Sequence, residues 1–320
     1  MVIDPTFDSS ITSSANAAAI ETAINSALAF YSVFTNPVTA RIDFQLAPSG
    51  SYFLGASLST YYLSSYASYT TALQTNATSY SNSVELSGYR HLGTGNKAQQ
   101  ILATSADYRA LNFNLPGILD AGGSADGTFD GVVYLNADDL SGFGHGGTYS
   151  AVPTIQHETN EVLGIGGSGS VLNVMESNGL TAPPLYGGQS AIGSLDLYRY
   201  SAPDTASLNT APYTVSYFSV DGGASSIFGF NQCSQGDYGD WVSRGNPCGT
   251  SVGALPPQVQ LAFTGPNSPA TMTLAAPEVT ALQAIGYDLA VSVPEPAPAA
   301  LFGAGLIALA IATRRRRASH

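Results

Sequence analysis

One segment constrains the fold of this chain more than any other, because it joins a helix pattern to residues that can bind a metal. Residues 152–163 read as a helix that ends at Gly164. Side chains four positions apart lie on one face of a helix, so His157 and Glu161 would stand one turn apart with Glu158 beside them. The fold must then bring a third ligand to this helix from elsewhere in the chain.

The spacing follows most of the His-Glu-x-x-His pattern of zincin metallopeptidases. In that pattern two imidazoles hold a metal and the intervening Glu acts as general base on a bound water. Here His157 and Glu158 fill the first two positions, and Glu161 takes the second ligand position, where a carboxylate oxygen can bind a metal. Gly164 matches the glycine at which a metzincin chain turns. Gly167 falls where the extended motif has its third His.

A third ligand must come from outside the helix, and residues 236–241 are its best source. Several stretches, in order along residues 5–290, resemble a group of bacterial zincin-type metalloproteases that often carry sorting tails. More distantly, the layout is similar to leishmanolysin-like metzincins, whose third ligand is a His directly before a Trp. The resemblance places Asp240 in that position, before Trp241, which we expect to be a packing residue. The stretches that carry the resemblance are 6–12, 157–164, 194–201, 217–223 and 281–287.

A site made of His157, Glu161 and Asp240 would have one neutral and two anionic ligands, which would neutralise a divalent ion. Oxygen-rich ligation favours Mn²⁺ or Ca²⁺ over Zn²⁺, which remains a candidate ion. A neutralised metal lowers the pKa of its bound water less, so hydrolysis would be slower. We expect a metallopeptidase-like hydrolase in which Glu158 is the general base. The alternative is a solvated helix face that binds no metal.

A few other residues offer roles near such a site. His145, in the glycine-rich loop 141–147, is an alternative ligand, although a loop His needs no metal. Asp196 could orient a ligand or cap its own element, and we favour the cap. Neither Met175 nor Met272 has the local pattern of the turn that lies beneath a metzincin metal.

The C-terminus predicts export. A proline-rich linker at 291–298 leads into an apolar run at 299–313 and then into a basic tail at 314–320. The run is shorter than the ~20 residues that span a bilayer comfortably. The arginines would stay cytoplasmic under the positive-inside rule. We therefore expect one membrane helix, with residues 1–290 on the far side of the membrane.

This tail resembles the PEP-CTERM sorting signal of Gram-negative bacteria, with Pro294, Glu295 and Pro296 as its motif. The resemblance implies an exosortase-type processing enzyme as a partner, transient anchoring in the inner membrane, and release to the cell surface or beyond. A permanent tail anchor is the alternative. Residues 1–8 lack the pattern of a signal peptide, so we expect the true start to lie upstream.

The same resemblance links the chain to an exopolysaccharide matrix and so suggests a second function. This alternative is a non-catalytic, matrix-associated binding or structural protein on a zincin-like scaffold. Its contact face would be residues 52–80, which are rich in Ser, Tyr and Thr. Ordinary half-buried aromatics are the simpler interpretation of that region.

Composition excludes one class of partner. Charged residues make up 10% of the chain and the formal charge is −12. A surface this acidic repels the phosphates of nucleic acids. The two cysteines, Cys233 and Cys248, are expected to pair as a disulfide in an oxidising compartment, with two unpaired thiols as the alternative.

The periodicities along the chain predict an α+β fold. The resemblance implies that residues 1–290 form one zincin- or metzincin-like domain around the helix at 152–163. Further helices are expected at 16–34, 57–73 and 276–285. Strands are expected at 38–46, 131–136, 213–220 and 226–230, and a short element at 195–200.

Overall fold

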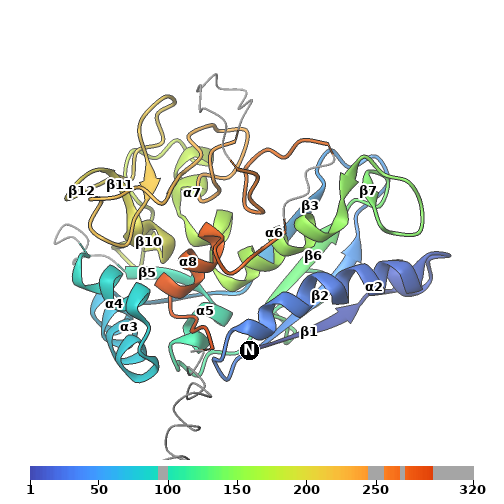
Figure 1. Cartoon of the computed structure of the whole chain (residues 1–320), viewed down its shortest axis with the longest axis horizontal. Coiled ribbons are helices and arrows are strands. Elements are labelled where there is room, and N and C mark those ends of the chain that lie inside the picture. Colours follow the sequence, from blue (N-terminus) through green and yellow to red (C-terminus); the bar gives the residue numbers. More distant parts are fainter. Residues whose placement is uncertain (93–99, 244–255, 267–270, 291–320) are drawn as a thin grey trace, which may run out of the picture. The chain divides into compact units, whose positions relative to one another are not determined.

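A four-stranded sheet with two helices beside it organises the first half of the chain (Figure 1). The computed structural model describes residues 1–92, 100–243, 256–266 and 271–290. The strand order is β1 (Val2–Phe7), β2 (Thr39–Leu46), β6 (Gly131–Leu135) and β3 (Gly55–Ser59). The first three strands run parallel and β3 pairs antiparallel with β6. β3 is therefore the edge strand on one side of this sheet.

Helix α6 (Ala151–Leu163) packs against β3, β6 and the helix α2 (Ala17–Leu28). A close approach of α6 to the sheet depends on Gly131. A Cβ there would lie 2.3 Å from a methyl of Val162, so only glycine lets the helix and strand meet at this point. Gly164 ends α6 with φ +105°, the left-handed conformation that glycine adopts most readily.

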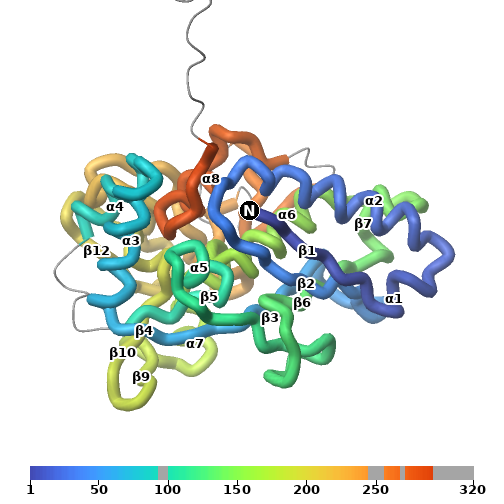
Figure 2. The backbone as a smooth tube through the Cα atoms, turned by 90° about the horizontal axis from the view of Figure 1, so that it is seen from below, coloured from blue at the N-terminus to red at the C-terminus, as the bar shows by residue number. Residues whose placement is uncertain are grey.

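Two further four-stranded sheets, a two-stranded sheet of β7 (Leu140–Ser141) and β8 (Tyr149–Ser150), and a group of helices complete the unit that runs from Met1 to Leu289. Helices α3 and α4 lie at the end opposite to α2 (Figure 2). One of the two four-stranded sheets has the order β4 (Tyr61–Ser65), β5 (Gln100–Thr104), β10 (Gln189–Gly193), β9 (Leu185–Tyr186), and the other β12 (Thr205–Ala206), β11 (Arg199–Ala202), β13 (Tyr217–Phe218), β14 (Phe228–Gly229). The remaining elements are α1 (Ser9–Thr12), η1 (Ala29–Val33), α3 (Tyr66–Tyr80), α4 (Ser83–Arg90), α5 (Ser105–Ala110), η3 (Gly166–Gly169), α7 (Leu172–Ser177), η4 (Leu195–Tyr198) and α8 (Pro277–Ala284).

The mixed α+β class is as expected, and most of the predicted elements are confirmed. The helices at 152–163 and 276–285 correspond to α6 and α8, and the helix at 16–34 to α2 followed by η1. The strands at 38–46 and 131–136 are β2 and β6. The strands expected at 213–220 and 226–230 shrink to the two-residue β13 and β14.

The helix expected at 57–73 is wrong over its first half. Residues 57–65 belong to β3 and β4, and α3 begins only at Tyr66. The Ser65 side chain accepts a hydrogen bond from the backbone N–H of Ser68 and so caps the start of α3. Before it, exposed and partly buried residues alternate along β4, which is the pattern of a strand at a surface.

The export signals lie outside the described residues. Among the residues that are described, no helix has the length and apolar character needed to cross a membrane. The linker at 291–298, the apolar run at 299–313 and the tail at 314–320 therefore stay predictions. Cys233 is fully buried, while Cys248 lies outside the described residues, so their pairing also stays a prediction.

Candidate metal centre

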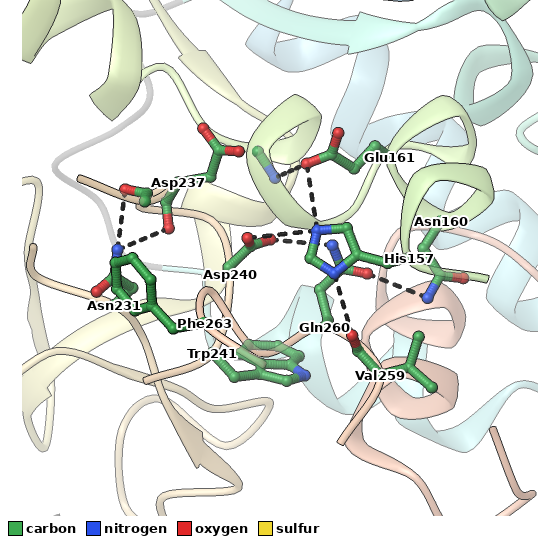
Figure 3. A network of polar contacts seen from close by, with 12 residues as sticks. His157, Asn160, Glu161, Asn231, Asp237, Asp240, Trp241, Val259, Gln260 and Phe263 are labelled. Atoms are coloured by element: carbon green, nitrogen blue, oxygen red, sulfur yellow. Dashed lines mark hydrogen bonds and ion pairs between the residues drawn. The ribbon is translucent and has the colours of Figure 1, made fainter. Parts of the chain in front are cut away.

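Three candidate ligands converge at α6, two from the helix itself and one from a segment that is distant in sequence. His157, Glu161 and Asp240 each offer a ligand atom, and these atoms all lie within 4.8 Å of one another. His157 Nε2 is 3.5 Å from Asp240 Oδ2 and 4.0 Å from Glu161 Oε1 (Figure 3). Metal–ligand bonds of about 2.0–2.2 Å in tetrahedral geometry place ligand atoms roughly 3.3–3.6 Å apart. The group is therefore close to the spacing that one shared cation requires.

Two glycines let the turn that carries Asp240 reach the end of α6. Gly166 has φ +64°, and a Cβ on it would lie 2.3 Å from Gln260 Nε2 and 2.9 Å from Asp240 Oδ1. A Cβ on Gly239 would lie 1.8 Å from the backbone oxygen of Gly166. The loop after α6 and the turn before Trp241 thus pack backbone against backbone, which no larger residue would allow.

A backbone carbonyl sets the tautomer of His157. Its Nδ1 lies 3.0 Å from the carbonyl oxygen of Val259. A carbonyl only accepts, so Nδ1 carries a hydrogen. Nε2 faces Glu161 and Asp240, and it would bind a metal in place of the proton that these carboxylates favour there.

A chain of buried side chains orients Asp240. Gln260 Nε2 donates to Asp240 Oδ1 at 2.9 Å, and Asn160 Nδ2 donates to Gln260 Oε1 at 3.1 Å. The hydroxyl of Tyr31 donates in turn to Asn160 Oδ1 at 2.8 Å. Because one carboxylate oxygen is held in this way, the other is directed at His157. Supporting hydrogen bonds of this kind fix the orientation of metal ligands.

Glu161 is held from the sheet and from the loop after α6. The backbone N–H of Gly167 donates to its Oε1 at 3.0 Å, and Ser57 Oγ on β3 donates to its Oε2 at 2.5 Å. The absence of a side chain at Gly167 matters, since a Cβ there would lie 2.7 Å from Glu161 Oε1. Gly167, which stands where the extended motif has its third His, therefore makes room for Glu161, the carboxylate that replaces the second His.

Glu158 lies between α6 and the edge strand, in the wall of the same cavity. A Cβ on Gly55 of β3 would lie 2.6 Å from its Oε1, so the strand passes directly over this carboxylate. The pKa of Glu158 is raised to about 7, chiefly by burial, with His157 lowering it and the charges of Asp240 and Asp237 adding to the rise. A carboxylate with a pKa near neutrality is suited to take up and return a proton.

The electrostatics of the site favour a bound cation. Burial raises the pKa of Glu161 well above its usual range, and neighbouring carboxylates add to this effect. Burial alone would lower the pKa of His157, but the charges of Asp240, Glu158 and Glu161 hold it well above its usual value. The group therefore binds a positive charge strongly, either a proton or a metal ion.

Asp237 is a further acidic residue of the site that was not predicted. Burial and the charge of Asp240 together raise its pKa to about 6, against the lowering effect of His157. It accepts a hydrogen bond from Asn173, and a Cβ on Gly167 would lie 3.0 Å from its Oδ2. The only sequence signal was the pair of Gly-Asp steps at 236–237 and 239–240.

A cavity of about 630 Å³ opens onto these residues. Its lining includes the ligands His157, Glu161 and Asp240, together with Glu158 and Asp237. Backbone and side chains of 52–57, before and within β3, form another part of its wall, and residues 258–265 form a third. The candidate ligands and the candidate base are thus open to one space large enough for a segment of a substrate.

The other residues considered from the sequence lie elsewhere. His145 is exposed between β7 and β8 and is not part of the ligand group. Asp196 accepts hydrogen bonds from Ser170 Oγ and from the N–H groups of Val171 and Gly193. It therefore anchors the start of α7 to the end of β10, and the expected cap on its own element is wrong.

Aromatic and sulfur side chains near the site serve in packing. Trp241 is fully buried against the rings of Phe218, Phe228 and Phe230. Met175 belongs to a small cluster beneath α7, and Met272 belongs to the main core. In the region 52–80, Tyr66 and Tyr69 are buried, so these two offer no contact face for a matrix.

No protein-family model, curated protein or solved structure matches this chain. Its own residues are therefore the basis for any functional assignment.

Proposed function

We propose that this protein is an exported, zincin-like metallopeptidase that hydrolyses peptide bonds with the aid of one divalent cation. His157, Glu161 and Asp240 would hold the cation and Glu158 would be the general base. One observation carries the proposal: the three ligand atoms lie within 4.8 Å of one another, in a cavity whose wall also includes Glu158. The candidate metal ligands and the candidate general base, which metal-assisted hydrolysis needs together, therefore line one cavity.

The donor set indicates which ions fit. One imidazole nitrogen and two carboxylates suit Mn²⁺ and Zn²⁺, and the abundance of oxygen also admits Ca²⁺. A bound cation would polarise a carbonyl group and lower the pKa of a bound water. Glu158, with its pKa near 7, would accept the proton that this water loses.

The edge strand supports a polypeptide as the substrate. β3 lies at the end of its sheet, and its residues Gly55 and Ser57 lie beside Glu158 and Glu161. The outward backbone groups of an edge strand can pair with an extended peptide. A peptide bound in this way would pass directly over the candidate base and the candidate ligands.

The zincin-like assignment also draws on topology. An active-site helix packed against a mixed sheet, with an antiparallel edge strand above it, is in keeping with the resemblance seen in the sequence. Export, processing by an exosortase-type enzyme and release at the cell surface remain part of the proposal through the tail at 291–320. Replacement of Pro294, Glu295 and Pro296 by alanines would retain the protein in the membrane if this part is correct.

Elemental analysis of residues 1–290 tests the metal centre. The wild-type protein should hold one equivalent of a divalent metal, which His157→Ala/Glu161→Ala should lose. The matched control His145→Ala/Glu176→Ala removes an exposed His and an exposed Glu and should keep the metal. Glu158→Gln should keep the metal but lower peptide cleavage about 10²- to 10⁴-fold, since this is the usual contribution of a general base.

The contrary outcome is equally definite. A folded, monodisperse protein that binds none of Mn²⁺, Zn²⁺ and Ca²⁺ would refute the metallopeptidase proposal. The non-catalytic, matrix-binding alternative would then be the better function, and binding to exopolysaccharide would be the next measurement.

A further inference from the structure

A second cavity adjoins the metal centre and continues its space. It has a volume of about 680 Å³, and it shares Ser57, Glu161 and Asp237 with the cavity of the metal centre. These residues form a common border between the two cavities. An extended ligand could therefore occupy both.

The second cavity is mainly apolar. Tyr62 and Leu63 of β4, Leu102 of β5, Val174 of α7 and Tyr186 of β9 contribute to its lining. Leu63 and Val174 remain 39% and 37% exposed. Apolar surface that is gathered in a concave site and left in contact with water is typical of a binding site.

Charge in this cavity is confined to its border with the metal centre. Glu161 and Asp237 are its acidic lining residues, and its lining includes no Lys or Arg. The phenol of Tyr61 is uncharged near neutral pH, with its pKa raised from 10.0 to about 12. The deeper part of the cavity thus offers contacts to an uncharged, apolar group.

We propose that this second cavity is the subsite that binds a bulky apolar side chain of the polypeptide substrate, either aromatic or branched aliphatic. The inference rests on the proposed peptidase function, because it identifies the occupant as part of the chain that is cleaved. The sharing of Ser57, Glu161 and Asp237 by the linings of the two adjoining cavities is the observation that links this occupant to the metal centre.

The direction of β3 indicates which substrate residue enters. Gly55 lies beside Glu158, Ser57 beside Glu161, and Ser59 Oγ lies 3.3 Å from Ser168 Oγ in the lining of the second cavity. A strand advances about 3.3 Å per residue, so the cavity lies two to four residues from the metal centre. Antiparallel pairing is the more stable arrangement, and it would place the apolar residue on the N-terminal side of the cleaved bond.

Cleavage profiling of a synthetic peptide library with the full chain and Mn²⁺ tests the inference. Phe, Tyr or Leu should be preferred over Ala at one fixed position, two to four residues before the cleaved bond, by about tenfold or more. Val174→Asp places a charge in the lining and should abolish this preference. Leu180→Asp is the matched control, because Leu180 is 39% exposed, close to the 37% of Val174, but lies outside the lining of this cavity. It should leave the preference unchanged.

A binding measurement separates this inference from the proposed function. The neutral fluorescent probe N-phenyl-1-naphthylamine should bind to the Glu158→Gln variant, and Val174→Asp should weaken that binding about tenfold while Leu180→Asp does not. If no peptide is cleaved with any metal, the proposed function fails. If Val174→Asp does not weaken binding of the probe, the apolar subsite is refuted as well. If peptides are cleaved without an apolar preference, or if the preference survives Val174→Asp, the inference is wrong and the proposed function stands.

Discussion

Two groups of buried carboxylates lie in this protein, and their surroundings differ. The candidate metal centre consists of His157, Glu161 and Asp240 and lines a cavity. The second group, here named the amide cluster, consists of the acids Glu85 and Asp288 with Asn36, Asn76 and Asn82. It joins the segment after α8 to α3, α4 and the loop before β2.

In the amide cluster, side-chain amides satisfy Asp288. Its Oδ1 accepts from Asn82 at 2.9 Å, and its Oδ2 accepts from Asn36 at 3.1 Å and from Asn76 at 2.9 Å. Glu85 accepts one bond from Asn76 at 3.2 Å, and burial raises its pKa to about 9. Amide donors therefore satisfy Asp288, and the raised pKa of Glu85 lets that acid retain its proton.

Asp240 in the candidate metal centre has fewer donors than Asp288 and a different partner. It has one amide donor, Gln260, and its other oxygen faces the imidazole of His157. A buried acid is costly unless it is paired and hydrogen-bonded. The comparison shows that a count of buried acids does not distinguish a candidate cation site from a structural cluster, whereas an imidazole partner and access to a cavity do.

The largest expected effect tests whether a cation is the missing partner of the metal centre. Mn²⁺ at about a thousandfold excess over its Kd should raise the free energy of unfolding of residues 1–290 by about 4 kcal/mol. Glu161→Gln/Asp240→Asn should remove this gain, because the variant lacks both anionic ligands. Urea unfolding with and without Mn²⁺ measures it. Equal gains in the two proteins would show that the metal binds elsewhere.

A carboxylate-to-amide substitution in the amide cluster should lower the stability of the protein and leave the effect of Mn²⁺ intact, whereas the same kind of substitution in the metal centre should remove the effect of Mn²⁺. Asp288→Asn should lower the free energy of unfolding by about 3 kcal/mol, since the amides of Asn36, Asn76 and Asn82 would lose their charged acceptor. The gain from Mn²⁺ should be unchanged. Asp126→Asn, at an exposed position, is the control and should change stability by less than about 0.5 kcal/mol. A harmless Asp288→Asn would mean that the cluster does not depend on this carboxylate.

A smaller effect should appear as a dependence on pH. Burial and the nearby charges of Asp288 and Asp107 raise the pKa of Glu85 from 4.5 to about 9. The folded protein then binds more protons than the unfolded chain between these values, so stability falls as pH rises through this window. We expect the wild type to lose about 2 kcal/mol more than Glu85→Gln between pH 6 and pH 8. Urea unfolding with a chelator present measures the difference, and parallel curves would show that Glu85 is not the proton-binding group.

The comparison also shows what the sequence could predict. The helix at 152–163 and the shared face of His157 and Glu161 follow from local periodicity, because residues four apart in a helix must be neighbours. Asp240 was chosen through a family resemblance, and no local pattern placed it 3.5 Å from His157. Its approach depends on the backbone contact between Gly166 and Gly239, more than seventy positions apart, which periodicity does not detect.

Other features could not be predicted either, because they also depend on contacts between residues that are far apart in the sequence. The amide cluster joins Asn36 to Asp288, 252 positions away, and each of its asparagines looks like an ordinary turn or helix residue in the sequence. The strands β3 and β4 were taken for a helix because Ser, Tyr and Leu fit either element when spacing is the only guide. Sheet pairing with β6 and β5 decides their conformation.

The smallest predicted effect concerns Gln260, a side-chain amide donor like the asparagines of the amide cluster. Gln260 holds one oxygen of Asp240 and so directs the other towards His157. Gln260→Ala should weaken Mn²⁺ binding about tenfold, which is about 1.4 kcal/mol, because loss of a supporting hydrogen bond lets a ligand rotate. Gln74→Ala, at an exposed position on α3, is the control. Isothermal titration with Mn²⁺ measures both variants. If Gln260→Ala binds as tightly as the wild type, the cation itself orients Asp240, and the amide donors of the two groups differ in purpose as well as in number.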